Sequence, residues 1–100
     1  MNFEYDRIKP ILNKHKHGIS LEDAKELWAV PHAQLPGRVT NELRHVIIGR
    51  LHSKFYVCVF TLRGENGENV RLISARRSRV GEERIYHEQI KEERIDGQGV

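Results

Sequence analysis

The run from Lys54 to Arg63 is the feature that most constrains the fold, because it is the most apolar stretch of the sequence. In an extended chain, successive side chains point to opposite sides. Here both sides are apolar, one carrying Phe55, Val57 and Val59 and the other Tyr56, Cys58 and Phe60. A strand that is apolar on both faces belongs in the interior of a sheet. A chain of 100 residues has room for one modest core, so the sequence predicts one domain built around this strand.

Three more strands are indicated. Residues 43–49 are apolar and β-branched. Residues 69–77 follow Asn66-Gly67, a pair that accommodates the positive φ angles of a tight hairpin turn. Residues 2–6 alternate aromatic and polar side chains, which is typical of a short strand.

The first helix is predicted before Gly18, which supplies the left-handed residue that commonly ends a helix. The residues that recur at the spacing of one helix face are Ile8, Ile11, Leu12 and His15. We therefore expect that face to pack against the rest of the protein.

Two further helices are predicted. One begins with a capping box at Ser20 and ends before Pro31, because the residue before a proline disfavours helical dihedrals. Residues 29–41 have no hydrophobic period and are predicted to be a loop. The last helix is expected over residues 80–94, and residues 96–100 are expected to be a frayed tail.

The predicted fold class is therefore α+β, with a small antiparallel sheet and helices packed against it. The predicted order of elements is strand, helix, helix, strand, strand, strand, helix. We expect residues 1–95 to form a single domain.

Positive charge is concentrated near the end of the last strand. The net charge of the chain is +3, but residues 71–80 carry four arginines and no acid, whereas residues 81–100 carry six acids and three bases. Strand alternation predicts Arg71 and Arg77 on one face and Arg76 on the other. Guanidinium groups match the geometry of phosphate oxygens, so this run is a candidate seat for an RNA backbone. Alternatively, the arginines pair with acids near or in the final helix. These acids are Glu82, Glu83, Glu88 and Asp96.

Several other classes of protein are disfavoured. The single cysteine, Cys58, rules out an internal disulfide and a cysteine-rich metal site. No segment approaches the roughly 20 apolar residues that span a bilayer, and the first residues lack a signal-peptide layout. We therefore expect a cytoplasmic protein that does not act at a membrane. His15 and His17 lack a third ligand at matching spacing, so we expect no metal and no other cofactor.

Four short motifs follow one another along the chain. They are Lys16-His17-Gly18-Ile19-Ser20, Glu42-x-Arg44, Arg71-Leu72-Ile73-Ser74-Ala75-Arg76 and Glu83-Arg84-x-Tyr86. Together they resemble the BrnT family of bacterial toxins over residues 3–87. The first and third motifs carry most of the specificity.

The resemblance implies a ribonuclease toxin of a type II toxin–antitoxin pair, with a RelE-like fold, that cleaves RNA and stops translation. It also implies neutralisation by a small BrnA-type antitoxin. The complex represses its own operon through the DNA-binding part of the antitoxin, so the toxin meets operator DNA only indirectly.

Metal-free RNA cleavage needs a base for the 2′-hydroxyl, cations for the charge of the phosphorane and an acid for the leaving 5′-oxygen. The candidate catalytic residues are His17, Glu42, Arg71, Arg76 and Tyr86. The candidate RNA-binding residues are Lys16, Arg44, Arg76, Arg77 and Arg79. His45 and Lys16 are further candidates for proton transfer.

Alternatives remain open for single residues and for the whole chain. His17 is about equally well explained as a cap of the first helix, and Tyr86 is slightly better explained as part of the core. The chain is alternatively a non-catalytic module that binds nucleic acid or protein. A third interpretation is an inactive toxin homologue that acts with its antitoxin as a co-repressor.

Overall fold

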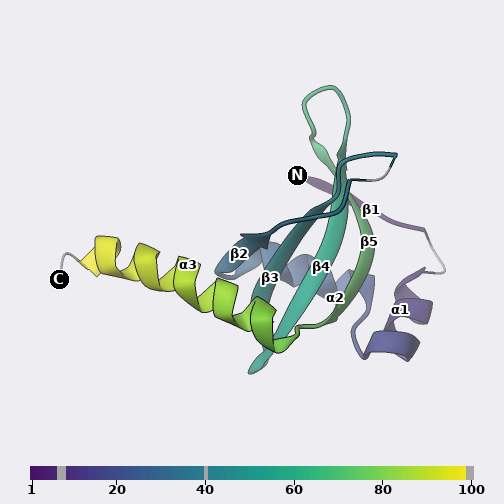
Figure 1. Ribbon diagram of the computed structural model, residues 1–100. Coiled ribbons are helices and arrows are strands. Elements are labelled where there is room, and N and C mark those ends of the chain that lie inside the picture. Colours follow the sequence, from purple (N-terminus) through teal and green to yellow (C-terminus); the bar gives the residue numbers. More distant parts are fainter. Residues whose placement is uncertain (7–8, 40, 99–100) are drawn as a thin grey trace.

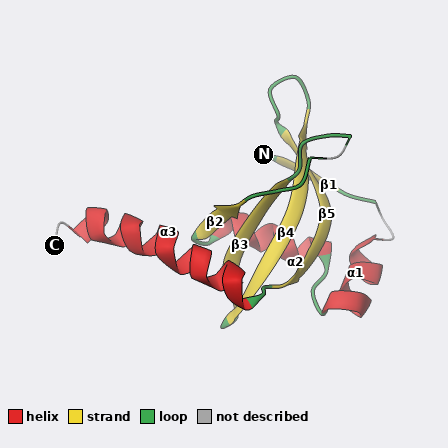
Figure 2. Cartoon of the chain, viewed as in Figure 1, coloured by secondary structure: helices red, strands yellow, loops and turns green. Residues whose placement is uncertain are grey.

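The computed structural model describes the backbone of residues 1–6, 9–39 and 41–98, and the side chains of these residues except 10 and 91–98. The elements are β1 (Asn2–Glu4), α1 (Lys9–His17), α2 (Leu21–Ala24), the 3-10 helix η1 (Lys25–Ala29), β2 (His32–Leu35), β3 (His45–Leu51), β4 (Lys54–Arg63), β5 (Asn69–Arg77) and α3 (Val80–Gln98). The α+β class is confirmed (Figure 2). No helix in the described part of the chain is both long and apolar enough to span a membrane.

The five strands form one sheet in the order β1-β5-β4-β3-β2 (Figure 1). β4 lies at the centre, as its apolar faces predict. The expected purely antiparallel sheet is wrong, because β1 pairs with β5 in parallel while the other neighbours are antiparallel. A three-residue edge strand carries too few side chains for its pattern to reveal the direction of pairing.

The segment predicted as a loop over residues 29–41 contains the edge strand β2, which pairs with β3 so that Ala33 lies opposite Ile48. Pro31 and Pro36 flank this strand. Proline is tolerated at the ends of an edge strand, where its missing N–H breaks no ladder bond. The prediction of a loop over this segment is therefore wrong for residues 32–35, because the two prolines bound a strand and do not exclude one.

The sheet has one covered face and one largely open face. α2 and η1 pack on the covered face, where Leu21, Leu27 and Phe60 belong to the main core (Figure 1). On the other face, α3 packs over β2 and β3, and Tyr86 lies against Ile48. We call this second side the open face, because α3 crosses one end of it and leaves the rest uncovered (Figure 1).

Cys58 lies in β4 and is fully buried, which confirms its interpretation as a small core residue. Burial raises the pKa of its thiol to about 12. The thiol is therefore protonated at neutral pH and unsuited to act as a nucleophile.

A β-bulge in β5 changes the expected alternation of the arginines. The register passes from Val59–Ser74 to Phe60–Leu72, so Ile73 is an extra residue between them. Residues directly opposite each other in a ladder share a face. Arg76 therefore lies on the open face with its partner Val57, and Arg71 lies there with its partner Thr61.

Arg77 lies on the covered face, opposite Tyr56, and its guanidinium carbon is 5.7 Å from the centre of the Tyr56 ring. The prediction that Arg71 and Arg77 share a face, away from Arg76, is therefore wrong. The physical reason is that one inserted residue reverses the two-residue period for every side chain that follows it.

The inner face of α1 is polar, which contradicts the predicted packing. Ile11 and Leu12 are 74% and 59% exposed, His15 is also exposed, and Ile8 lies outside the described residues. The buried side chain is Asn13.

The Asn13 side chain forms hydrogen bonds with backbone groups of β5, as a neighbouring strand would. Its Nδ2 donates to the carbonyls of Ile19 (2.6 Å) and Ala75 (2.8 Å), and its Oδ1 accepts from the Ala75 N–H (3.2 Å). β1 pairs with residues 69–71. The carboxamide therefore takes the place of a ladder partner farther along β5.

The last two helices depart from their predicted extents. Ser20 caps α2 by accepting from the Asp23 N–H (3.0 Å), as predicted, but the helix tightens into η1 after Ala24. α3 runs to Gln98, beyond the predicted end at Arg94. Of the expected tail at 96–100, residues 99 and 100 lie outside the described residues.

Candidate functional site

A pocket of about 320 Å³ lies on the open face beside the start of α3. Its lining consists of Leu35, Pro36, Gly37, Arg38, Arg44, Val46, Val59, Arg76, Arg79 and Glu82. Val46 and Val59 are opposite each other on β3 and β4 and supply apolar surface. Around them stand four arginines and one glutamate, an excess of three positive charges. The pocket is therefore suited to an anion.

Each arginine reaches the pocket from a different part of the chain. The bulge turns Arg76 of β5 onto the open face, and Arg79 stands directly before α3. Arg38 and Arg44 come from the two ends of the loop between β2 and β3, joined by a hydrogen bond from the Arg44 N–H to the Arg38 carbonyl (3.3 Å). Gly37 permits this closure, because a Cβ there would overlap the backbone carbonyl of Arg44.

Arg76 is held by a two-pronged ion pair with Glu82. Its Nη1 and Nη2 donate to the two carboxylate oxygens at 2.8 and 2.6 Å. The hydrogen bonds from Arg76 lower the pKa of Glu82, and the same bonds raise the pKa of Arg76. Glu82 also accepts from the Arg79 N–H (2.8 Å), as the third residue of a helix does in a capping box. Glu82 thus fixes both Arg76 and the start of α3.

Arg44 is the arginine with an unsatisfied donor. Among the buried side-chain atoms of the described residues, Arg44 Nε and Thr61 Oγ1 have no hydrogen-bond partner. Arg44 directly precedes His45, the partner of Phe60 in the β3–β4 ladder, and Thr61 directly follows Phe60, so both residues stand at the same end of these two strands, as do the ion-paired Glu42 and Arg63 (3.3 Å). Buried polar groups normally find a partner. A bound oxyanion at this end of the open face would supply an acceptor to both.

The structure brings together part of the predicted site. Arg44, Arg76 and Arg79 line the pocket. Glu42 and Arg71 lie on the same face outside the pocket, Glu42 paired with Arg63 and Arg71 with Glu4 (3.8 Å).

The remaining predicted residues lie elsewhere. Lys16 and His17 line a separate hollow of about 260 Å³ at the edge of β5, which they share with Ser74. Tyr86 is 9% exposed and its ring meets that of Phe55 edge-on at 4.9 Å. This contact accords with the core-packing interpretation of Tyr86.

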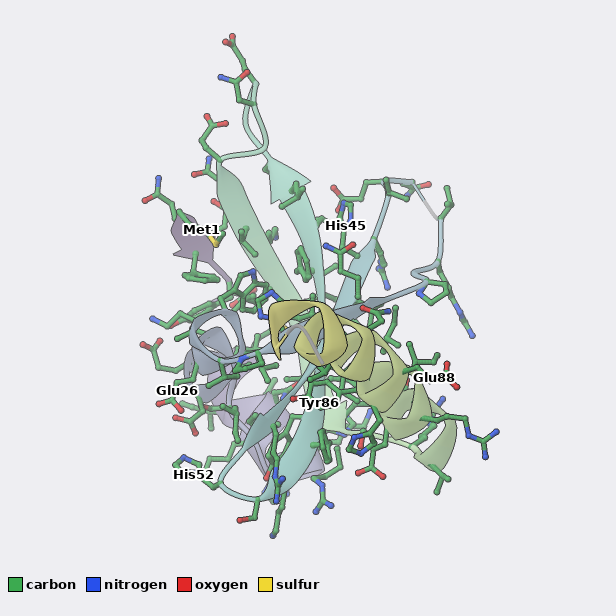
Figure 3. All side chains as sticks on the ribbon, turned by 90° about the vertical axis from the view of Figure 1, so that its left-hand side faces the viewer. Met1, Glu26, His45, His52, Tyr86 and Glu88 are labelled. Carbon is green, nitrogen blue, oxygen red and sulfur yellow. The ribbon has the colours of Figure 1, made fainter. Side chains whose placement is uncertain are left out.

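His45 is turned away from the pocket. Its ring stacks on Phe60, at 5.4 Å between centres, and Phe60 belongs to the core of the covered face. His45 begins β3, His52 follows its last residue, and Tyr86 belongs to α3; Figure 3 shows the three side chains well apart. The three histidine or tyrosine side chains thus occupy different regions of the molecule.

Two charged residues of the pocket, Arg38 and Glu82, are not among the predicted site residues. Arg38 lies in a segment without hydrophobic period, so nothing in the sequence indicated where its side chain would be placed. The sequence offers Glu82 only as an acid that pairs with an arginine, and for Arg76 that alternative is confirmed. The spacing of Arg79 and Glu82, the positions of a capping box at the start of α3, was the available signal.

In the described part of the chain, His, Cys, Asp and Glu side chains form no group of three placed to hold a metal ion.

Comparison with known proteins identifies a family through one family model and finds a similar fold in one solved structure. The family model described as "Ribonuclease toxin, BrnT, of type II toxin-antitoxin system" matches residues 5–82, which include all the residues that line the pocket. The crystal structure of the ribonuclease toxin BrnT from Brucella abortus is similar to this structure, with a TM-score of 0.62 and 22% sequence identity. The match covers 79% of this chain and 97% of that one, and at this identity it supports the fold alone. No curated protein matches the chain.

Proposed function

The chain belongs to the BrnT family of ribonuclease toxins of type II toxin–antitoxin systems, and from this membership we propose that it cleaves RNA at the arginine-lined pocket of the open face. The proposed activity inhibits translation in the cytoplasm, requires no metal, and resides in residues 1–95 with a RelE-like architecture. A BrnA-type antitoxin neutralises it and connects it indirectly to operator DNA.

The observation that carries this proposal is the excess of three positive charges around the pocket, together with the unpaired Nε of Arg44. A phosphodiester carries one negative charge, and its charge increases by one in the transition state of cleavage. Fixed guanidinium groups stabilise such a developing charge because they need little reorganisation. Arg76 is already fixed by Glu82. In the described part of the chain, Arg38, Arg44 and Arg79 form no ion pair, so their charge is available to a substrate.

The proposed reaction is an internal displacement at phosphorus. The 2′-oxygen of RNA forms a bond to the adjacent phosphorus while the bond from phosphorus to the 5′-oxygen breaks. A base accepts the proton of the 2′-hydroxyl, and an acid gives a proton to the leaving 5′-oxygen. The products end in a 2′,3′-cyclic phosphate and a 5′-hydroxyl, and no oxidant or water is consumed.

We propose that the proton carriers come from His17, Glu42 and Tyr86, with Lys16, Arg71 and Arg77 as further contacts to RNA. Glu42 lies on the open face two residues from Arg44, whereas His17 approaches from the far edge of β5. His17→Gln, Glu42→Gln and Tyr86→Phe separate these roles. Loss of a true proton carrier is expected to lower kcat by about 100-fold or more with a smaller change in KM.

The experiment that tests the proposed function is cleavage of a labelled single-stranded RNA by the purified chain, free of antitoxin, with Mg²⁺ or with excess EDTA. We expect equal cleavage in both, with cyclic-phosphate ends. Cleavage that disappears in EDTA would contradict the metal-free reaction. Absence of cleavage in both, with the chain folded, would favour the binding module or the inactive homologue.

A further inference from the structure

Helix α1 presents apolar side chains to solvent. Ile11 and Leu12 are 74% and 59% exposed, while the polar Asn13 faces inward. The inward position of Asn13 is explained by its hydrogen bonds to Ala75 and Ile19. The exposure of two adjacent large aliphatic residues is not explained by folding, and such exposure on a small protein often marks a docking surface.

The charges of α1 all have one sign. Between Lys9 and His17 the helix carries three lysines and two histidines and no acid. Lys9, Lys14 and Lys16 are exposed. The hollow beside Ile11 is also lined by Glu22 and Asp23 of α2, whereas the hollow beside Leu12 is lined by Lys9, Lys16 and His17 and by no acid. On its Leu12 side, this surface, formed by α1 around Ile11 and Leu12, is complementary to a segment that is acidic and has apolar side chains of its own.

We propose that α1 is the docking surface for an acidic, partly apolar segment of the antitoxin; the proposal rests on the proposed function in that this chain is a toxin with a protein inhibitor. A protein fits the surface better than RNA does, for two reasons. Ile11 and Leu12 offer no hydrogen-bond donor to phosphate, and under a sugar–phosphate backbone their large exposed apolar surface would remain unburied.

Occupation of this surface also suggests how the antitoxin affects the site. Leu12 lines the hollow that holds Lys16, His17 and Ser74. A segment bound over Leu12 covers that hollow and blocks the approach to the edge of β5. The same contact therefore binds the partner and covers Lys16, a proposed RNA contact, and His17, a proposed proton carrier.

The test measures binding of the full-length chain to the protein encoded by the gene next to its own. The variant is Ile11→Asp/Leu12→Asp, which changes exposed side chains and adds like charge to an acidic partner. We expect about 100-fold weaker binding, because the two aspartates replace apolar surface that the partner buries and place unpaired charges in the interface. Lys14→Glu is expected to weaken binding about 10-fold, with a smaller dependence on salt.

Leu62→Asp is the matched control, because Leu62 is an exposed aliphatic residue next to the last residue of β4. The hairpin that follows β4 lies away from α1 (Figure 1). Leu62→Asp is expected to bind as the wild type does. Unchanged binding by the folded double variant would overturn the proposal, as would the absence of any complex with the wild-type chain. Weaker RNA binding with unchanged partner binding would assign the surface to the substrate. Binding is measured without RNA, so this result does not depend on whether the chain cleaves RNA.

Discussion

The ion pair of Arg76 and Glu82 shows how a single carboxylate shapes the proposed site. Both side chains are largely buried, at 24% and 20% exposed, and their contacts are short and two-pronged. Such a pair holds the guanidinium in place, and the carboxylate neutralises part of its positive charge. Glu82 is therefore a positioning residue, while the charge that remains available belongs to Arg38, Arg44 and Arg79.

Glu82→Gln is expected to lower the free energy of unfolding by about 2 kcal/mol at neutral pH, because it leaves Arg76 partly buried and unpaired. The pKa of Glu82 is lowered in the folded state. Its stabilising effect is therefore present above the ordinary glutamate pKa of about 4.3 and is lost as the pH falls through the lower folded value.

Urea unfolding as a function of pH measures this effect. The difference between wild type and Glu82→Gln is expected to shrink in acid. Glu83→Gln, at the neighbouring half-buried position, is the control and is expected to show little difference at any pH. A difference for Glu82→Gln that stays constant into strong acid would contradict the role of its ionised carboxylate.

The turn between β3 and β4 contains two residues in the left-handed region. His52 and Ser53 have φ angles of 52° and 73° and occupy a two-residue hairpin turn between the paired Leu51 and Lys54. Glycine adopts this conformation without the steric cost of a Cβ. Ser53→Gly is expected to raise the free energy of unfolding by about 0.5–1 kcal/mol. Ser53→Ala retains a Cβ, so urea unfolding that shows the same gain for both variants would contradict this explanation.

At the level of elements, side-chain carboxamides close both edges of the sheet. Asn13 of α1 pairs with the backbone of Ala75 on β5. On the opposite edge, Gln89 of α3 donates to the carbonyl of Gln34 (2.8 Å) and accepts from its N–H (3.2 Å). Each amide occupies backbone groups that an exposed edge would offer to another strand.

The carboxamides of Asn13 and Gln89 differ in burial, so removing each is expected to lower the free energy of unfolding by a different amount. Asn13→Ala leaves three buried backbone groups without a partner and is expected to cost about 3 kcal/mol. Gln89→Ala leaves groups that water reaches and is expected to cost about 1 kcal/mol or less. Urea unfolding measures both. Equal costs would contradict the distinction between a buried and a solvated edge.

The elements also show which parts of the fold the sequence predicts. The position of β4 followed from apolar residues on both faces, and the hairpin before β5 followed from Asn66-Gly67. The bulge at Ile73 left no sequence signal, yet it decides which face carries Arg76. The inward packing of Asn13 likewise depends on an unpaired edge elsewhere in the chain. Local patterns therefore identified the arginines as site candidates, and long-range pairing determined which of them meet.

At the scale of the whole molecule, the distribution of charge matters more than its sum. The net charge of the chain is +3, and the pocket alone has an excess of three positive charges. The rest of the molecule is close to balanced. An anionic strand approaching the protein is thus drawn to one part of the open face, where two valines and four arginines meet.

The cleavage rate of a single-stranded RNA by Arg44→Ala, compared with Arg50→Ala, tests the central claim most directly. Both arginines belong to the β3 region, but Arg50 is exposed outside the pocket, with its guanidinium over Phe55 at 5.8 Å. Arg44 is partly buried, so Arg44→Ala could lose activity by unfolding. Arg79→Ala changes an exposed residue of the pocket and tests the same claim without that risk. We predict that kcat/KM falls about 100-fold in Arg44→Ala and about 10-fold or more in Arg79→Ala, while Arg50→Ala stays within about 3-fold of wild type. Wild-type rates in both folded pocket variants would contradict the account.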